Sequence, residues 1–379
     1  MGALKKIILG LLVIALPLGE VARLTFNEVA ITILDIGVAI TVLFWVVVRR
    51  KIPRSYLAKP ITLFIAALLI SLLVNAIRLN VNELFVSSLY LLRWVFYTLL
   101  YFVVLDLSLI RKKIERAIFI GGGIILLVGY ILYFLYPDLR NLRYGGWDEH
   151  LYRLFSTFLD PNFAGSFLVL YFLFLIDKLS TRKNNLLRFI SIATLIAIVL
   201  TFSRSAYVML FTGIVILLYL KGMKFLAIGF IALFLVLIII TTQLSFRSEG
   251  TNLLRTASGE ARLDSIKNAI TIFKDHPIFG VGFNSYRYSQ RDYGFLNEKK
   301  MIVHSGAGTD NSFLFILATS GVVGFGAFLF LLFKILSIKD SLIVASTIAL
   351  FVNSLFINAL FYPEVMLWMW VLLGLRENT

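Results

Sequence analysis

The feature that most constrains this chain is a series of apolar runs that recur along nearly all of its 379 residues. A helix of about 20 apolar residues crosses the roughly 30 Å hydrocarbon core of a bilayer, so each run predicts a transmembrane helix. The composition agrees, because 60% of the residues are hydrophobic and the mean hydropathy is +0.91. We therefore predict an all-α polytopic membrane helix bundle with about twelve transmembrane helices. The predicted spans lie near residues 4–19, 28–48, 60–77, 84–105, 115–136, 161–177, 186–202, 205–220, 223–242, 311–333, 341–361 and 364–376.

The connections between these runs alternate in charge. Lys and Arg collect in the cytoplasmic loops of membrane proteins. Here they gather in every second connection, whereas the other short connections hold only Arg23, Arg78 and Arg204. This predicts a bacterial inner-membrane protein with both termini in the cytoplasm. The lipid bilayer also accounts for the formal net charge of +15, so we expect no nucleic-acid partner. The basic connections carry Arg49, Arg50, Lys51, Arg54 and Lys59, then Arg111, Lys112, Lys113 and Arg116, then Lys178, Arg182, Lys183 and Arg188, then Lys221 and Lys224, then Lys334 and Lys339.

Two longer connections face the other way and are predicted to be extracytoplasmic. The second of them contains apolar residues at helical spacing, which predict an amphipathic helix over about 260–274 that ends before Pro277. We read this loop as an external subdomain with short helices. The predicted organisation is a transmembrane bundle of nine spans over residues 1–242 with an external loop at 137–160, the subdomain at 243–310, and three further spans over 311–379.

No metal site or cofactor is expected from the sequence. The chain has no cysteine, and its three histidines are scattered, with no carboxylate at ligand spacing to any of them. No Gly-rich nucleotide-binding loop faces the cytoplasm, so ATP hydrolysis is not expected. His150, His276 and His304 all fall in the two outer loops. The titratable side chains are therefore predicted to be displayed outside the cytoplasm.

Arg93 lies in the middle of the predicted span 84–105. A cation at that depth costs about 2.5–3.5 kcal/mol on insertion scales, so its side chain should face the bundle interior and a partner. One interpretation is a structural ion pair with Asp35, Glu28 or Glu83. The other is an anion-binding role in a membrane cavity.

Arg204 lies in a very short turn between two apolar runs, on the side where positive charge is disfavoured. Ser203 or Ser205 could cap the following helix, whose free N–H groups attract anions. A guanidinium offers a planar fork for a phosphate at such a place. The alternative is that Arg204 only extends its charge to the membrane interface, as Arg near a helix end often does.

Four other polar residues have a functional or a plain structural interpretation. Arg262 lies near the start of the amphipathic helix, where the helix dipole does not favour a cation, which hints at a ligand or a partner. Asp160 precedes Pro161 as a helix N-cap would. Asp310, just before a predicted span, could also be only an N-cap. His276 alone fits a turn residue at the end of the amphipathic helix.

Four segments, in this order, resemble the motifs of the O-antigen ligase and polymerase family of bacterial envelope glycan assembly. The first includes Arg153-Leu154, Thr157-Phe158 and Asp160-Pro161-Asn162, and the second is the turn Thr201-Phe202-Ser203-Arg204-Ser205-Ala206. The third joins Arg262 to His276-Pro277 and Gly280-Val281-Gly282. The fourth is Asp310-Asn311-Ser312-Phe313-Leu314, followed by Gly321-Val322-Val323-Gly324.

The resemblance implies a glycosyltransferase that takes its glycan from a polyprenyl-diphosphate-linked donor. The acceptor would be a lipid core sugar for a ligase, or another glycan repeat unit for a polymerase. The reaction would need neither metal nor nucleotide and would invert the anomeric centre. Arg204 and Arg262 would hold the diphosphate, with Arg93 near the headgroup, and Asp310 or His304 would be the base. The remaining motif residues are Arg153, Asn162, His276, Gly280, Gly282 and Asn311.

One position departs from the family pattern. Ligases of this family usually carry His where this chain has Asp310, and the nearest histidine is His304. This leaves both the base and the choice between ligase and polymerase open. The rival class is a polytopic flippase or transporter of lipid-linked oligosaccharide. Such a protein would need charged residues along the bilayer midplane, and only Arg93 and Asp35 lie well inside predicted spans, away from the span ends.

Overall fold

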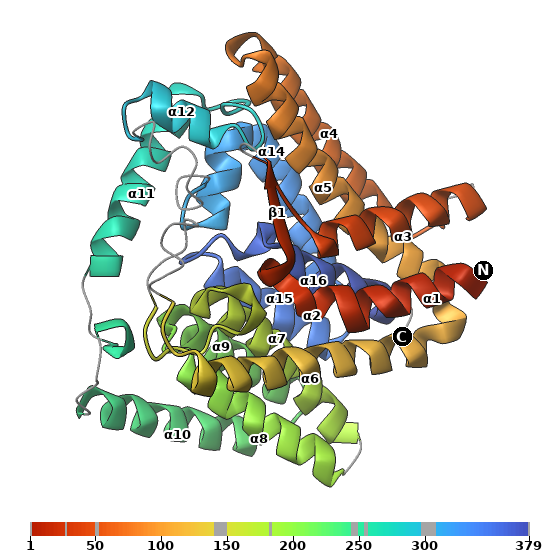
Figure 1. Ribbon diagram of the computed structural model, residues 1–379, viewed down its shortest axis with the longest axis vertical. Coiled ribbons are helices and arrows are strands. Elements are labelled where there is room, and N and C mark those ends of the chain that lie inside the picture. Colours follow the sequence, from red (N-terminus) through yellow and green to blue (C-terminus); the bar gives the residue numbers. More distant parts are fainter. Residues whose placement is uncertain are drawn as a thin grey trace.

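The structure is a computed structural model, and it is a helical bundle with one two-stranded hairpin (Figure 1). The amino-terminal rod consists of α1 (Gly2–Gly10), a π-helical stretch η1 (Leu11–Ala15) and α2 (Leu16–Leu18). A 3-10 turn η2 (Gly19–Ala22) leads into the antiparallel strands β1 (Arg23–Phe26) and β2 (Val29–Thr32), with Arg23 opposite Thr32. The structure describes residues 2–26, 29–49, 53–139, 150–181, 184–243, 249–253, 257–296 and 308–377.

Each of the predicted spans overlaps a helix, although the helix within 28–48 begins only at Ile33 and the helix within 341–361 ends at Asn353. After the rod come α3 (Ile33–Arg49), α4 (Ala58–Val74), α5 (Val81–Asp106), α6 (Arg111–Leu135), α7 (Pro161–Thr181), α8 (Asn185–Leu200), α9 (Arg204–Leu220) and α10 (Lys224–Gln243). The carboxyl-terminal part contributes α14 (Ser312–Leu336), α15 (Ser341–Asn353) and α16 (Pro363–Arg376). Short 3-10 turns are η3 (Ala76–Arg78), η4 (Ser108–Ile110), η6 (Ser156–Phe158), η7 (Glu249–Thr251) and η9 (Ala359–Phe361).

Among the described residues, six helical stretches are long and apolar enough to cross a membrane. The helices α8, α9 and α15 are apolar but shorter. The chain is therefore built as an all-α integral membrane protein, as predicted. The count of twelve crossings stays a prediction, since several of the helices that match predicted spans are too short to establish a crossing by length alone. The six stretches are Gly2–Ala22, Ala58–Arg78, Val81–Asp106, Ser108–Leu135, Pro161–Thr181 and Ser312–Leu336.

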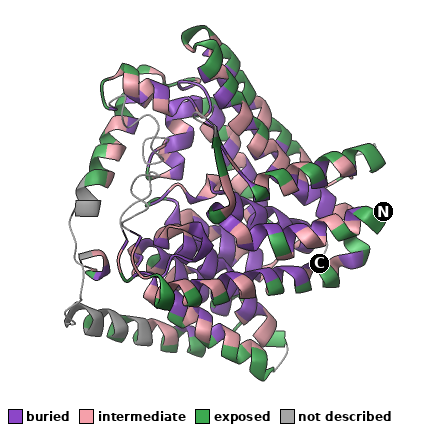
Figure 2. Cartoon of the chain, in the orientation of Figure 1, coloured by how far each residue is buried: buried purple, intermediate pink, exposed green. Residues whose placement is uncertain are grey.

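Helices α7 and α16 form the centre of the bundle, because both are apolar on every side and buried over most of their length. The ring of Trp368 on α16 packs edge-on against Phe167 and Phe174 of α7, with centroids 5.2 and 5.8 Å apart. In Figure 2 the centre of the bundle is mostly purple, whereas exposed residues line the outer faces of α4 and α8. The outward-facing apolar side chains are those expected of helices that contact lipid.

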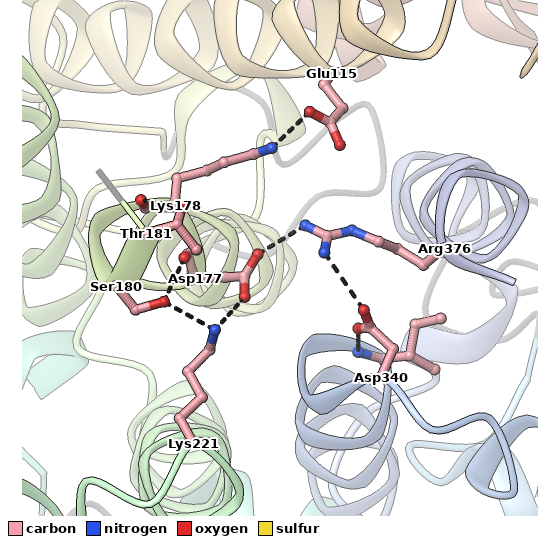
Figure 3. A network of polar contacts seen from close by, with 9 residues as sticks. Glu115, Asp177, Lys178, Ser180, Thr181, Lys221, Asp340 and Arg376 are labelled. Carbon is pink, nitrogen blue, oxygen red and sulfur yellow. Dashed lines mark hydrogen bonds and ion pairs between the residues drawn. The ribbon is translucent and has the colours of Figure 1, made fainter. Parts of the chain in front are cut away.

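An ion-pair network ties five elements together at one end of the bundle (Figure 3). Asp177 at the end of α7 accepts contacts from Arg376 of α16 and from Lys221 just after α9, each at 2.7 Å. Arg376 also lies 3.4 Å from Asp340, the N-cap of α15. Lys178 pairs with Glu115 of α6 at 2.6 Å. Lys178 and Lys221 belong to the connections predicted to be cytoplasmic, so this network is predicted to close the cytoplasmic end.

The opposite side of the molecule carries α11 (Ala257–Asp275) and α12 (Tyr286–Asp292), away from the two termini (Figure 1). Helix α11 matches the predicted amphipathic helix, and it ends directly before His276-Pro277 as expected. Ala269 and Ile272 are its buried residues, whereas Leu263 and Lys267 are exposed. Helix α11 packs against the amino-terminal part of α14 and so brings Arg262 toward the bundle.

Candidate active site

The turn between α8 and α9 presents Arg204 as the first residue of α9. Ser203 is the N-cap of that helix, and its hydroxyl accepts a hydrogen bond from the N–H of Ala206 at 3.4 Å. Of the two serines that could cap α9, Ser203 is therefore the one that does. The half-buried Arg204 side chain donates to the carbonyl oxygen of Leu253 at 3.3 Å. A cation thus stands beside a helix N-terminus, where backbone N–H groups and the helix dipole already favour an anion.

Arg153 fixes this turn from the neighbouring loop. Its side chain is only 3% exposed, and its Nε donates to the carbonyl oxygen of Thr201 at 2.9 Å. Its Nη2 donates to Oδ1 of Asn162 at 3.3 Å, and the same oxygen accepts a hydrogen bond from the Ser203 hydroxyl at 3.0 Å. Nη1 of Arg153 lies 3.1 Å from Nδ1 of His150. Arg153 and Asn162 therefore join the first and second motifs into one rigid unit.

The backbone around this unit is strained. Tyr152, Ser156, Leu159 and Phe202 have φ angles of 56°, 51°, 55° and 47°, the left-handed region that costs side chains other than glycine. All four lie in the loop before α7 or in the turn before α9. Conformations of this kind persist only where the surroundings hold them, and they gather at functional sites.

Arg262 on α11 lies within electrostatic range of Arg204, Asp310 and Asp160. Partial burial lowers the pKa of its guanidinium, the charge of Asp310 raises that pKa, and the charge of Arg204 lowers it again. One turn further along α11, the Ser265 hydroxyl accepts a hydrogen bond from the backbone N–H of Asp310 at 3.2 Å. The structure thus brings together charged residues from α9, from α11 and from the starts of α7 and α14.

Asp160 is the N-cap of α7, as predicted. Its Oδ1 accepts hydrogen bonds from the N–H groups of Asn162 at 2.6 Å and Phe163 at 3.4 Å. Burial raises the pKa of this carboxyl, while those hydrogen bonds and the charge of Arg153 lower it. Capping explains its presence beside the arginines.

Asp310 is not the N-cap of α14, so that structural interpretation is wrong. Asn311 is the cap, and its Oδ1 accepts from the N–H groups of Phe313 at 2.9 Å and Leu314 at 3.0 Å. Asp310 is exposed and precedes the helix by one further residue. Its side chain is therefore not used to begin α14. His304, the other predicted base, lies outside the described residues.

Arg93 takes part in an ion pair. Its Nη2 lies 2.8 Å from Oδ2 of Asp35 and also donates to the carbonyl oxygen of Ala30. Asp35 accepts a further hydrogen bond from the Tyr97 hydroxyl at 2.9 Å. The guanidinium also lies 4.8 Å from the ring centre of Tyr90, beside a small cavity of about 170 Å³. The pair with Asp35 is one of the three ion pairs considered for Arg93. The residues around the guanidinium belong to β2, α3 and α5, and none of them belongs to the charged group around Arg262.

Gly280 and Gly282 have a structural role in a break in α14. Helix α14 is interrupted at Gly321, whose φ is 62°. The segment after α11 enters this break, so that Val281 N–H donates to the carbonyl oxygen of Ala318 and Gly282 N–H to that of Thr319, both at 3.0 Å. A Cβ on Gly280 would come within 2.4 Å of the Thr319 carbonyl carbon, and φ at Gly280 is 64°. Only glycine meets both requirements.

His276 lies beside the same anchor and away from the arginines. Its ring nitrogens are 3.0 Å from Nη1 of Arg78, and burial together with the charge of Arg78 lowers its pKa. It is separated from Arg262 by most of α11, or roughly 20 Å at 1.5 Å per residue. The third motif therefore consists of two parts: Arg262 in the charged group, and an anchor of His276, Gly280 and Gly282.

Sequence reasoning missed two residues of interest. Glu364 on α16 is 0% exposed, and neither of its carboxylate oxygens has a hydrogen-bond partner among the described residues. Tyr286 on α12 is also 0% exposed, and its hydroxyl lacks such a partner within the same part of the chain. A glutamate within an apolar run was a visible signal for Glu364. No sequence signal distinguishes Tyr286 from the other 15 tyrosines.

Comparison with known proteins agrees with these motifs. No curated protein matches the chain. Residues 189–329 match the model of the family described as O-antigen ligase. That stretch runs from α8 through most of α14 and includes Arg204, Arg262, the Gly280–Gly282 anchor and Asp310. The resemblance predicted from the sequence is thereby confirmed: over residues 189–329 this integral membrane protein is similar to the O-antigen ligase family.

Proposed function

We propose that the protein is a glycosyltransferase that takes a glycan from a polyprenyl-diphosphate carrier on the extracytoplasmic side of the inner membrane. It transfers the glycan to a lipid-core sugar or to another glycan repeat unit. The family match supports glycan transfer in the membrane. The donor, the face and the mechanism are inferred from the candidate site.

The observation that carries the proposal is the approach of two like charges. Arg204 and Arg262 come from different helices, and the positive charge of Arg204 lowers the pKa of the Arg262 guanidinium. Partial burial of Arg262 adds to this cost. A doubly charged anion between the two guanidinium groups would offset the repulsion between them. Its oxygens would also accept hydrogen bonds from backbone N–H groups at the start of α9. A diphosphate has the charge and the oxygen geometry for this role.

The proposed reaction is a single displacement. The oxygen of the acceptor hydroxyl attacks the anomeric carbon of the donor glycan. The bond between that carbon and the diphosphate oxygen breaks, and its electron pair leaves with the diphosphate. Arg204 and Arg262 stabilise the negative charge that develops there. The hydroxyl proton passes to a base, and the anomeric centre is inverted.

Asp310 is the described residue best placed to be the base. Its side chain is not needed as a helix cap, and Ser265 holds its backbone beside Arg262. It occupies the position at which ligases of the family usually carry His. This difference supports a polymerase at least as well as a ligase. The alternative of a flippase or transporter is not favoured by the family match.

Glycan transfer by the purified protein in proteoliposomes tests the proposal. The substrates would be a polyprenyl-diphosphate-linked repeat unit, either alone or with a lipid-core acceptor. We expect new glycosidic product with the wild-type protein and far less with Arg204→Ala, which should keep its expression and its unfolding temperature. Product with the repeat unit alone indicates a polymerase, and product only with the lipid core indicates a ligase. Movement of intact donor across the bilayer without new product would overturn the proposal in favour of a flippase.

A further inference from the structure

Tyr286 is a fully buried tyrosine whose hydroxyl has no hydrogen-bond partner among the described residues. A buried hydroxyl that makes no hydrogen bond is costly, and each such group calls for an explanation. Tyr286 begins α12 directly after Ser285, whose hydroxyl donates to the carbonyl oxygens of Val281 and Gly282 at 2.6 and 2.8 Å. The phenol is thus attached to the anchor that enters the break in α14, and its position is fixed.

Tyr286 packs against the start of α14, which begins just after Asp310 and Asn311. The charge of Asp310 acts on the phenol and, after burial, is the second cause that raises the pKa of Tyr286. The Tyr286 ring packs against Phe315 on the first turn of α14, with centroids 6.5 Å apart. Phe315 N–H in turn donates to the carbonyl oxygen of Asn311, the residue after Asp310. The phenol and the carboxylate therefore belong to two elements that are packed together.

Asp310 itself has a fixed backbone and an exposed side chain. Its N–H donates to Ser265, and the next residue caps α14. Arg262 on α11 is within electrostatic range of Asp310, and Arg204 on α9 and Asp160 before α7 are within range of Arg262. If Arg262 binds a diphosphate, its charge is directed to the phosphate oxygens, and Asp310 loses part of its electrostatic support.

We propose that Tyr286 is a positioning residue that donates a hydrogen bond to the Asp310 carboxylate when the donor diphosphate occupies Arg204 and Arg262. This inference rests on the function proposed above. The phenol then fixes one rotamer of Asp310 toward the acceptor hydroxyl. The proton of the acceptor passes to Asp310, and the phenol keeps its own proton throughout. On this proposal the buried hydroxyl, which has no partner among the described residues, gains one during the reaction, when the Asp310 carboxylate accepts its hydrogen bond.

Tyr286→Phe removes only the hydroxyl and leaves the packed ring. We expect kcat for glycan transfer to fall about tenfold to a hundredfold, the range for loss of a hydrogen bond to a charged group, with KM for the donor little changed. Loss of the donor hydrogen bond also raises the pKa of Asp310 in the complex, because that bond favours the charged carboxylate. The acidic limb of the kcat profile, where Asp310 becomes protonated, should therefore move to higher pH.

Tyr101→Phe is the matched control. Tyr101 is also 0% exposed, and its hydroxyl also lacks a hydrogen-bond partner among the described residues, but it lies on α5 between Phe102 and Trp370. Removal of that hydroxyl should change neither kcat nor the pH profile. Equal effects of the two substitutions would show a general packing effect and would overturn the proposal, as would a wild-type kcat and pH profile in Tyr286→Phe.

Asp310→Asn separates this inference from the proposed function. If Asp310→Asn transfers glycan at the wild-type rate, Asp310 is not the base, and both the assignment of the base and the role of Tyr286 fail. If Asp310→Asn is inactive and Tyr286→Phe behaves as the wild type, only the role of Tyr286 fails. The double variant should be no slower than Asp310→Asn alone, because the phenol acts only through the carboxylate.

Discussion

The backbone N–H of Gly282 lies 3.0 Å from the carbonyl oxygen of Thr319, so a loop after α11 completes the hydrogen bonding of a broken membrane helix. Val281 with Ala318 and Val322 with Pro277 repeat the contact on either side of the break. The amide of Asn75 on the neighbouring α4 end donates to the carbonyl oxygen of Gly280 at 3.0 Å. The carboxyl-terminal end of α11 is therefore attached to the bundle by backbone geometry.

Gly280→Ala should destabilise the protein by roughly 1–3 kcal/mol or more, since the methyl group would meet α14 and the left-handed φ would be strained. Thermal unfolding in detergent measures this. Gly294→Ala is a control with a similar φ of 71° and open space around the Cβ, so it isolates the cost of the dihedral angle. Gly326→Ala, which meets neither restriction, should be neutral. If Gly280→Ala is no worse than Gly294→Ala, the contact with α14 contributes nothing.

Arg204→Ala and Arg262→Ala should each reduce glycan transfer strongly, and their effects should not add. Both side chains are proposed to hold one leaving group, so the second substitution removes little that the first has left. Steady-state kinetics of the two single variants and of the double variant measure the coupling. Lys at either position should restore only part of the rate, because the planar fork is lost. Additive losses would show that the two arginines do not share a phosphate.

Asp310→Asn should abolish transfer, whereas Asn311→Ala should mainly cost stability, about 1 kcal/mol for a lost N-cap. The two substitutions thus distinguish loss of the catalytic base at Asp310 from loss of the helix cap at Asn311. The measurements are kcat and the unfolding temperature of both variants. His304→Ala completes the set. Normal transfer by Asp310→Asn together with no transfer by His304→Ala would move the role of base to His304.

Transfer should not depend on a divalent metal ion. No group of three His, Cys, Asp or Glu side chains suited to a metal ion occurs within the described residues, and the proposed leaving-group charge is met by Arg204 and Arg262. Activity should therefore be the same after dialysis against a chelator and after addition of magnesium or manganese. Loss with the chelator and recovery with either ion would contradict the proposed mechanism.

Asp177→Asn should destabilise the bundle by about 3 kcal/mol, because it leaves Arg376 and Lys221 without their shared carboxylate. The turnover of the protein that remains folded should be unchanged, since this network lies at the end predicted to face the cytoplasm. The control is Lys267→Ala, which removes an exposed pair with Asp264 and should have almost no effect. Equal unfolding temperatures for the two variants would rule out a stabilising role for the network.

The helices and two of the caps could be predicted because their signals are local. Apolar runs located the helices, and Ser203 and Asp160 are caps by residue type and position. The cap of α14 was mistaken, because Asp310 and Asn311 are adjacent and both residue types cap well. Local chemistry could not distinguish them. Which of the two residues becomes the cap depends on two contacts with distant segments. The backbone N–H of Asp310 donates to Ser265 on α11, and the side-chain amide of Asn311 donates to the carbonyl oxygen of Leu355.

Other features depend on contacts between distant segments and left no local trace. Three acidic residues could have paired with Arg93, and only the packing of α3 against α5 selects Asp35. Gly321 stands in an apolar run that predicts an unbroken helix, and its break exists only because residues 277–282 enter it. The third motif was read as one segment of the site, although α11 separates Arg262 from the anchor at its far end.

The break in α14 also has a consequence for the order of assembly. Residues 277–282 leave the ribosome before residues 318–323, so the loop is synthesised before the helix whose hydrogen bonding it completes. Unsatisfied N–H and C=O groups are costly in a bilayer, which makes the broken helix a poor membrane segment by itself. Entry of α14 into the bilayer and docking of the loop are therefore coupled. Arg262 on α11 is positioned in the candidate site only after α14 has been inserted.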